Sequence, residues 1–237
     1  MTDALITAAW CAGAYLLGAV PFGLLIGFAH GKDIRLEGSR NIGATNCGRV
    51  CGAASGVLAF LLDMGKGFLP AWAGARWLPA LLGYPADPGL WERGEWLALV
   101  AVALAPILGH VLPVYLRFRG GKAVATSLGV LLGLPLLRWM ALAAFGVWVL
   151  VVLVTRYVAV GSSVAALALV AGYLGFNWAR AWGACLPVTV FVVALVAMVL
   201  ARHRANYVRL WRGEENRIGG RKAPHPPPPP PDGPLTA

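Results

Sequence analysis

Polar segments rich in glycine, serine, asparagine and arginine interrupt an otherwise apolar chain. The first reads GSRNIGATNCGR and runs from Gly38 to Arg49. Glycine lets a backbone approach a ligand closely, while Ser39, Asn41 and Thr45 supply oriented hydrogen-bonding groups. Together with the Arg49 cation, such a segment suits an anion. The same residue types also build an ordinary loop between two helices, and that alternative stays open.

A second segment contains Gly120, Gly121 and Lys122, which we expect to open an apolar helix. Backbone amides at a helix N-terminus and a nearby lysine together form a phosphate site. The spacing is not that of a nucleotide-binding P-loop, and Gly-Gly-Lys by itself is a weak signal.

A third segment begins at His203, just past the last apolar run. His203 and Asn206 are three residues apart and therefore share one face of a helix. The arginines around them are typical of an anchor that meets anionic lipid, but this role needs neither histidine nor asparagine. Glu215 follows in a polar stretch to which the sequence assigns no role.

Charged and polar residues also occur inside the apolar runs. Asp63 and Lys66 are three residues apart in the second run, where a charge costs a few kcal/mol unless it is paired or hydrated. They form either a structural ion pair or part of a substrate site. His110 and Ser162 lie near helix ends, where such residues most often pack or hydrogen-bond between helices.

The composition is that of a membrane protein. Hydrophobic residues make up 59% of the 237 residues and charged residues only 13%, against about a quarter charged in a typical soluble domain. Each apolar run is continuous, which favours helices. We predict an all-α integral membrane protein of about seven transmembrane helices, over residues 4–29, 53–75, 96–116, 123–137, 139–154, 158–176 and 182–200.

The basic residues predict the orientation. With the N-terminus outside, most lysines and arginines fall in cytoplasmic loops, and only Arg76, Arg93, Arg138 and Arg180 lie in outside loops. The C-terminus is then cytoplasmic. Asp3 is the only charge before the first run, which favours a retained helix over a cleaved signal peptide.

The domain organisation is simple. We expect one transmembrane domain over residues 1–220 and a proline-rich disordered tail over residues 221–237. The tail is either merely solvated or a docking site for a partner. We expect Cys11, Cys47, Cys51 and Cys185 to be free thiols and predict no metal site.

In this order and spacing, the polar segments resemble the membrane-embedded bacterial acyl-phosphate:glycerol-3-phosphate acyltransferase family. The resemblance covers nearly the whole chain before the proline tail. It is carried by GSRNIGATN from Gly38, GHVLPVYLRFRGGKAVAT from Gly109 and HRANYVRLWRGEENRIG from His203, with support from LDMGKGFLP from Leu62 and TRYVAVGSS from Thr155. The chain has Arg40 and Ala123 where the family usually has glycine, and Arg119 where it usually has lysine.

The resemblance implies acyl transfer from acyl phosphate to the sn-1 hydroxyl of glycerol 3-phosphate, which yields lysophosphatidic acid and phosphate for phospholipid synthesis. It implies no cofactor and no metal, and a bacterial cytoplasmic (inner) membrane location with the active site on the cytoplasmic face. We expect a monomer that contacts membrane lipid and no nucleic acid.

On this basis we assign the acyl-phosphate head to Ser39, Asn41, Thr45, Gly120, Gly121 and Lys122. Glycerol 3-phosphate is assigned to Arg49, Ser162, His203 and Asn206. The predicted catalytic residues are Ser39, Lys122, His203 and Asn206.

Acyl phosphate is already an activated donor, so we expect direct attack without an acyl-enzyme. The general base is either His203 or the donor's own phosphate, and the resemblance favours the phosphate. A transporter for an anionic metabolite and a lipid-binding scaffold are the alternatives from other functional classes. We find no internal repeat that favours a transporter. A lipid-binding scaffold would not account for the ordered motifs that contain Ser, Asn and His.

Overall fold

The computed structural model describes residues 3–219. The predicted tail of residues 221–237 lies outside the described residues. Within residues 3–219 the secondary structure is entirely helical, as predicted, with α-helices and short 3-10 turns at Pro88–Leu90 and Val114–Leu116. The α-helices are α1 Asp3–Ala19, α2 Phe22–Ala29, α3 Ala44–Cys51, α4 Ala53–Leu82, α5 Arg93–Val111, α6 Val124–Gly133, α7 Arg138–Thr155, α8 Val158–Ala181, α9 Leu186–Arg202 and α10 Arg204–Trp211.

Each predicted run overlaps one of the helices α1 and α4–α9, but several boundaries were wrong. The run over residues 4–29 is broken between α1 and α2, because Pro21 has no N–H to continue the helix. The second run continues to Leu82 instead of ending at residue 75. The fourth is shorter than predicted, since α6 spans only Val124–Gly133.

Not every apolar run has the length of a membrane span. Among the described helices, four segments are long and apolar enough to cross a membrane: 3–29, 93–116, 138–155 and 158–181. The pair α9 and α10, bent by 45°, makes a fifth when counted as one span. The count of seven crossings therefore stays a prediction.

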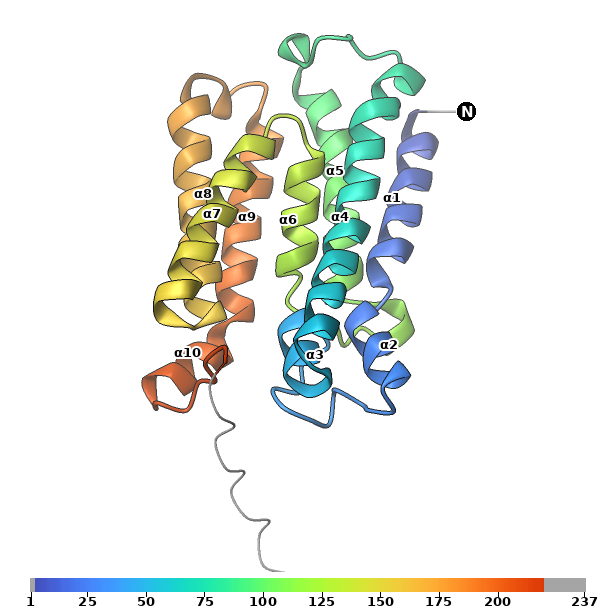
Figure 1. Ribbon diagram of the computed structural model, residues 1–237. Coiled ribbons are helices and arrows are strands. Elements are labelled where there is room, and N and C mark those ends of the chain that lie inside the picture. The colour runs from blue at the N-terminus through green and yellow to red at the C-terminus, as the bar shows by residue number, and fades with distance from the viewer. Residues whose placement is uncertain (1–2, 220–237) are drawn as a thin grey trace, which may run out of the picture.

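The helices form two groups that stand side by side (Figure 1). In one group α4 packs on α6 and α1 packs on α5, and in the other α8 lies between α7 and α9. A Cβ on Gly67 of α4 or on Gly129 of α6 would overlap the backbone of the facing helix, so these glycines allow the close approach of α4 and α6. Contacts of α5 with α9 and of α6 with α7 join the two groups.

The two ends of the bundle differ in charge. The N-terminus of α1 lies at the end opposite to α10, as an odd number of crossings requires (Figure 1). The end with α2, α3 and α10 carries the three polar segments and most of the basic residues. Which end faces the cytoplasm stays a prediction. All four cysteines are free thiols.

Candidate functional site

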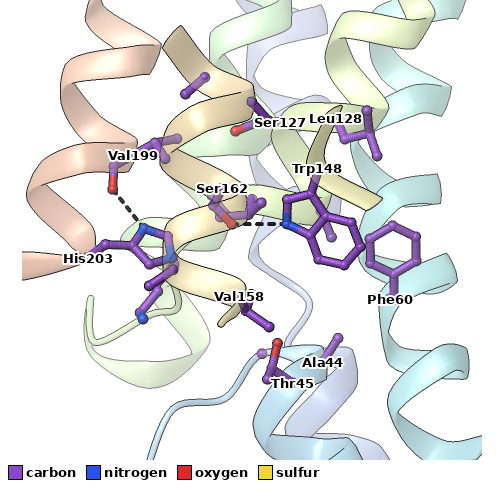
Figure 2. Close-up of a pocket in the computed structure, with 18 of the residues that line it drawn as sticks. Ala44, Thr45, Phe60, Ser127, Leu128, Trp148, Val158, Ser162, Val199 and His203 are labelled. Atoms are coloured by element: carbon purple, nitrogen blue, oxygen red, sulfur yellow. Dashed lines mark hydrogen bonds between the residues drawn. The ribbon is translucent and has the colours of Figure 1, made fainter. Parts of the chain in front are cut away.

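A cavity opens at the basic end and extends between the two helix groups. Its polar part is lined by Ser39, Asn41, Thr45, Arg49, Lys122, Ser162, His203 and Asn206, together with Glu215 and Asn216. Its apolar part includes Leu131, Ala141, Ala144, Phe145, Leu169, Leu195 and Val196. Figure 2 shows His203 and Val199 on one wall, Phe60 on the opposite wall, and Ser162 with Trp148 between them. The cavity can therefore hold a molecule with a charged head and a hydrocarbon chain.

A chain of polar contacts joins Lys122 to the C-terminal segment. Lys122 Nζ donates to Asn206 Oδ1, and Asn206 Nδ2 donates to Glu215 Oε1 at 2.7 Å. The other oxygen of Glu215 accepts from Arg209 Nε at 2.8 Å. Because each group has a fixed donor or acceptor role, this series of hydrogen bonds sets the orientation of the Asn206 amide and holds Lys122 beside it.

His203 lies at the bend between α9 and α10 and is buried. Its Nδ1 lies 2.8 Å from Val199 O, and a carbonyl oxygen can only accept, so Nδ1 carries the proton of the neutral ring. Nε2 is then the unprotonated nitrogen in a cavity-lining residue. On the neighbouring wall, Ser162 Oγ accepts a hydrogen bond from Trp148 Nε1 at 3.2 Å, which fixes the hydroxyl oxygen (Figure 2).

The loop before α3 is held in place by Asn46. The Asn46 side chain donates to Ile34 O at 2.8 Å and to Glu37 O at 3.1 Å, and it accepts from Ser39 N at 2.7 Å. Asn41 Oδ1 accepts from Gly43 N at 2.9 Å. The loop therefore presents Ser39 and Asn41 to the cavity from a fixed backbone, with Thr45 and Arg49 following on α3.

Several cations surround the polar part of the cavity. The pKa of Lys122 is lowered to about 8, chiefly by burial; Glu215 opposes this shift, and Arg209, Arg202 and Arg49 add to it. Burial likewise lowers the pKa of Arg49. The Glu215 carboxylate already pairs with Arg209. An anion that enters the cavity therefore finds positive charge in excess and a partly dehydrated lysine.

The expectation that Gly120 and Gly121 offer free backbone amides was wrong. Gly120 N donates to Val111 O at 3.2 Å, and Gly121 N donates to His110 O at 3.1 Å. Neither glycine lines the cavity, and α6 begins only at Val124. The carbonyl oxygens of both glycines accept hydrogen bonds from Arg202. These glycines form a tight turn whose next residue, Lys122, reaches the cavity.

Sequence reasoning missed several residues that line the cavity. Glu215 and Asn216 reach it because the chain after α10 folds back, where Ile218 N donates to Arg156 O at 2.9 Å. No local pattern indicates that return. Asp63 and His110 also line the cavity; both were noted from the sequence as polar residues in apolar runs but were not assigned to the site.

Comparison with known proteins gives consistent matches. A family model described as "Glycerol-3-phosphate acyltransferase" matches residues 8–213. A glycerol-3-phosphate acyltransferase of Bordetella pertussis is 38% identical over 210 residues, which cover 88% of this chain and 90% of that one. One of Thermosynechococcus vestitus is 41% identical over 220 residues, with 92% and 98% covered.

Solved structures agree in fold. The crystal structure of PlsY, an integral membrane glycerol 3-phosphate acyltransferase, in its glycerol 3-phosphate form matches with a TM-score of 0.74 and 35% identity. The match covers 89% of this chain and 94% of that one. Its lysophosphatidic acid form matches with a TM-score of 0.71 and 34% identity.

Proposed function

Because this chain belongs to the glycerol-3-phosphate acyltransferase family, we propose that it transfers a fatty acyl group from acyl phosphate to the sn-1 hydroxyl of glycerol 3-phosphate. The products are lysophosphatidic acid and inorganic phosphate, the first of them a precursor of membrane phospholipid. The named ligands of the PlsY structures, glycerol 3-phosphate and lysophosphatidic acid, support this substrate and product.

The observation that carries the proposal is the two-part cavity. Arg49, Lys122, His203 and Asn206 line its polar part, and aliphatic and aromatic side chains, mostly of α6–α9, line its apolar part. A phosphate group suits the first part, and a fatty acyl chain suits the second, where each buried CH₂ contributes about 0.8 kcal/mol.

The two substrates divide the polar part between them. The acyl-phosphate head is assigned to Ser39, Asn41, Thr45 and Lys122, with Gly120 and Gly121 contributing through the turn that carries Lys122. Glycerol 3-phosphate is assigned to Arg49, Ser162, His203 and Asn206. Since Lys122 donates to Asn206, the two phosphates meet at this pair, and the cations of the cavity offset their mutual repulsion.

The reaction proceeds by direct attack. The sn-1 oxygen of glycerol 3-phosphate forms a bond to the acyl carbonyl carbon, and the bond from that carbon to the phosphate oxygen breaks. The hydroxyl proton passes to the departing phosphate, or to Nε2 of His203 if the imidazole is the base. The protein contributes by positioning both substrates and stabilising negative charge, with Lys122 nearest the phosphate that leaves.

We further propose a multi-pass location in the bacterial cytoplasmic membrane, with the cavity mouth towards the cytoplasm. The concentration of basic residues at the cavity end supports this orientation. It also gives water-soluble glycerol 3-phosphate direct access, while the acyl chain enters from the bilayer.

A reconstitution assay tests the proposal. Purified protein in liposomes receives palmitoyl phosphate and labelled glycerol 3-phosphate, and we expect equal amounts of lysophosphatidic acid and phosphate. Palmitoyl-coenzyme A and palmitoyl-acyl carrier protein serve as matched donors and should give no product. Uptake of labelled glycerol 3-phosphate into the liposomes without product would contradict the proposal and favour transport.

A further inference from the structure

A buried polar cluster lies beside the turn that carries Lys122. Asp63 and Lys66 of α4, His110 of α5 and Thr126 of α6 are each at most 4% exposed. Asp63 Oδ1 lies 2.7 Å from Lys66 Nζ and 3.7 Å from His110 Nδ1. His110 Nδ1 also lies 3.1 Å from Thr126 Oγ1. The cluster thus places polar groups from two other helices at the Nδ1 edge of the His110 ring.

Lys66 ties the same cluster to the break between α1 and α2. Its ammonium donates to Val20 O at 2.6 Å, a carbonyl at the break that Pro21 causes. Asp63 and Lys66 therefore balance each other's charge inside the bundle. The ion pair with Lys66 holds the Asp63 carboxylate at the cavity wall, whereas Lys66 itself does not line the cavity.

The opposite side of the His110 ring meets the glycine turn. Gly121 N donates to His110 O at 3.1 Å, so the turn is bonded to the backbone of the same residue. A Cβ on Gly121 would overlap Nε2 of the ring and lie 3.1 Å from Cδ2. The imidazole is therefore packed against the Gly121 backbone, one residue before Lys122.

We propose that His110 is a positioning residue for Lys122, with Asp63 and Thr126 holding its ring against the glycine turn. The ring and the carbonyl of His110 restrain the Gly121 backbone, and Arg202 restrains it from the other side through the Gly120 and Gly121 carbonyls. Lys122 then leaves the turn in a defined direction, towards Asn206. This inference rests on the proposed binding of phosphate by Lys122.

The role predicts a particular kinetic change. In His110→Asn the polar contact near Thr126 is retained in part, but the ring no longer fills the space against Gly121. We expect KM for palmitoyl phosphate, and the inhibition constant of inorganic phosphate, to rise roughly tenfold, as when one polar contact is lost. We expect kcat to fall less, because the reacting groups are otherwise intact.

Thr189→Val is the matched control. Thr189 is also buried and hydrogen-bonded, to Tyr173 OH at 2.9 Å and Ala181 O at 2.7 Å, but it lies outside the cavity lining. Thr189→Val should lower the thermal unfolding midpoint without changing KM for palmitoyl phosphate or the inhibition constant of inorganic phosphate. If His110→Asn folds and changes stability alone, as Thr189→Val does, the positioning role is wrong.

A double-mutant cycle on the folded variants tests the contact between His110 and Gly121 itself. Gly121→Ala places a methyl group into the His110 ring and should raise KM strongly. In a His110→Ala background the ring is absent, so Gly121→Ala should raise KM by a factor at least about tenfold smaller. Additive effects of the two substitutions would overturn the proposal.

Lys122→Ala separates this inference from the proposed function. If Lys122→Ala raises KM and the phosphate inhibition constant but folded His110→Asn does not, only the positioning role fails. If Lys122→Ala itself leaves both constants unchanged, the phosphate assignment fails and the inference fails with it.

Discussion

Lys122 Nζ donates a hydrogen bond to Asn206 Oδ1, across 84 residues of sequence. Lys122 follows the glycine turn before α6, and Asn206 lies on α10 after the bend at His203. The contact joins the two helix groups at the polar part of the cavity. It is also the point where the proposed sites for the two phosphates meet.

Removal of the Lys122 ammonium should abolish most activity. In Lys122→Ala we expect kcat/KM to fall at least about a hundredfold, the usual cost of losing a group that stabilises developing charge. Arg119→Ala is the matched control, because Arg119 is an exposed cation of the same segment and does not line the cavity. Steady-state assays of both variants, with the unfolding midpoint measured in parallel, check this. Normal activity of folded Lys122→Ala would contradict the phosphate assignment.

The pKa of Lys122, lowered by burial to about 8, predicts an alkaline limit of activity. The charged form binds phosphate, and it is present below about pH 8 and lost as the pH rises through that value. Phosphate monoesters have a second pKa of about 6, so the substrate is already a dianion there. A plot of kcat/KM against pH should therefore fall above about pH 8, since this ratio reports the free enzyme.

Lys122→Arg is the control for this assignment. Arginine stays protonated throughout the range, so the alkaline decrease should disappear from whatever activity remains. An unchanged decrease in Lys122→Arg would assign it to another group.

His203→Gln distinguishes the two candidate bases. If the donor phosphate accepts the proton, His203 serves to position glycerol 3-phosphate, and its loss should raise KM for that substrate more than it lowers kcat. If Nε2 is the base, kcat should fall by a factor of about 10² to 10⁴. Initial rates over a range of glycerol 3-phosphate concentrations measure both constants, and we expect the first result.

Asn206→Asp should be more harmful than the small change in shape suggests. The new carboxylate would lie beside Glu215 Oε1, where Asn206 Nδ2 now donates at 2.7 Å, and would also attract Lys122 away from substrate. We expect a loss of at least about tenfold in kcat/KM together with a lower unfolding midpoint, since two like charges in one partly buried site repel. Activity equal to that of the unaltered protein would show that the amide orientation does not matter.

The apolar part of the cavity should determine the acyl-chain length. Ala144 of α7 lines it, whereas Ala143 on the same helix is exposed. Ala144→Leu should lower kcat/KM for palmitoyl phosphate relative to decanoyl phosphate by roughly tenfold or more, because each excluded CH₂ costs about 0.8 kcal/mol. Ala143→Leu adds the same side chain away from the cavity and should leave the ratio unchanged. Equal effects of the two substitutions would place the acyl chain elsewhere.

The sequence alone determined the class of the protein and the residue types of the site. Low charge and continuous apolar runs leave helices in a membrane as the way to satisfy the backbone. The predicted residues Ser39, Asn41, Thr45, Arg49, Ser162 and His203 all line the same cavity, as do Lys122 and Asn206. Composition and short-range spacing indicated the membrane class and the polar segments, and the family resemblance indicated which of their residues belong to the site.

Only the tertiary structure decided how those residues meet. The glycine amides were expected to face a ligand, but they bond to the end of α5, since buried N–H groups take the nearest free carbonyls. Glu215 enters the cavity because the chain folds back after α10, and His110 meets Gly121 because the glycine turn folds back onto the C-terminal end of α5. Such contacts join residues distant in sequence, and they depend on which helices pack together, which local propensity does not encode.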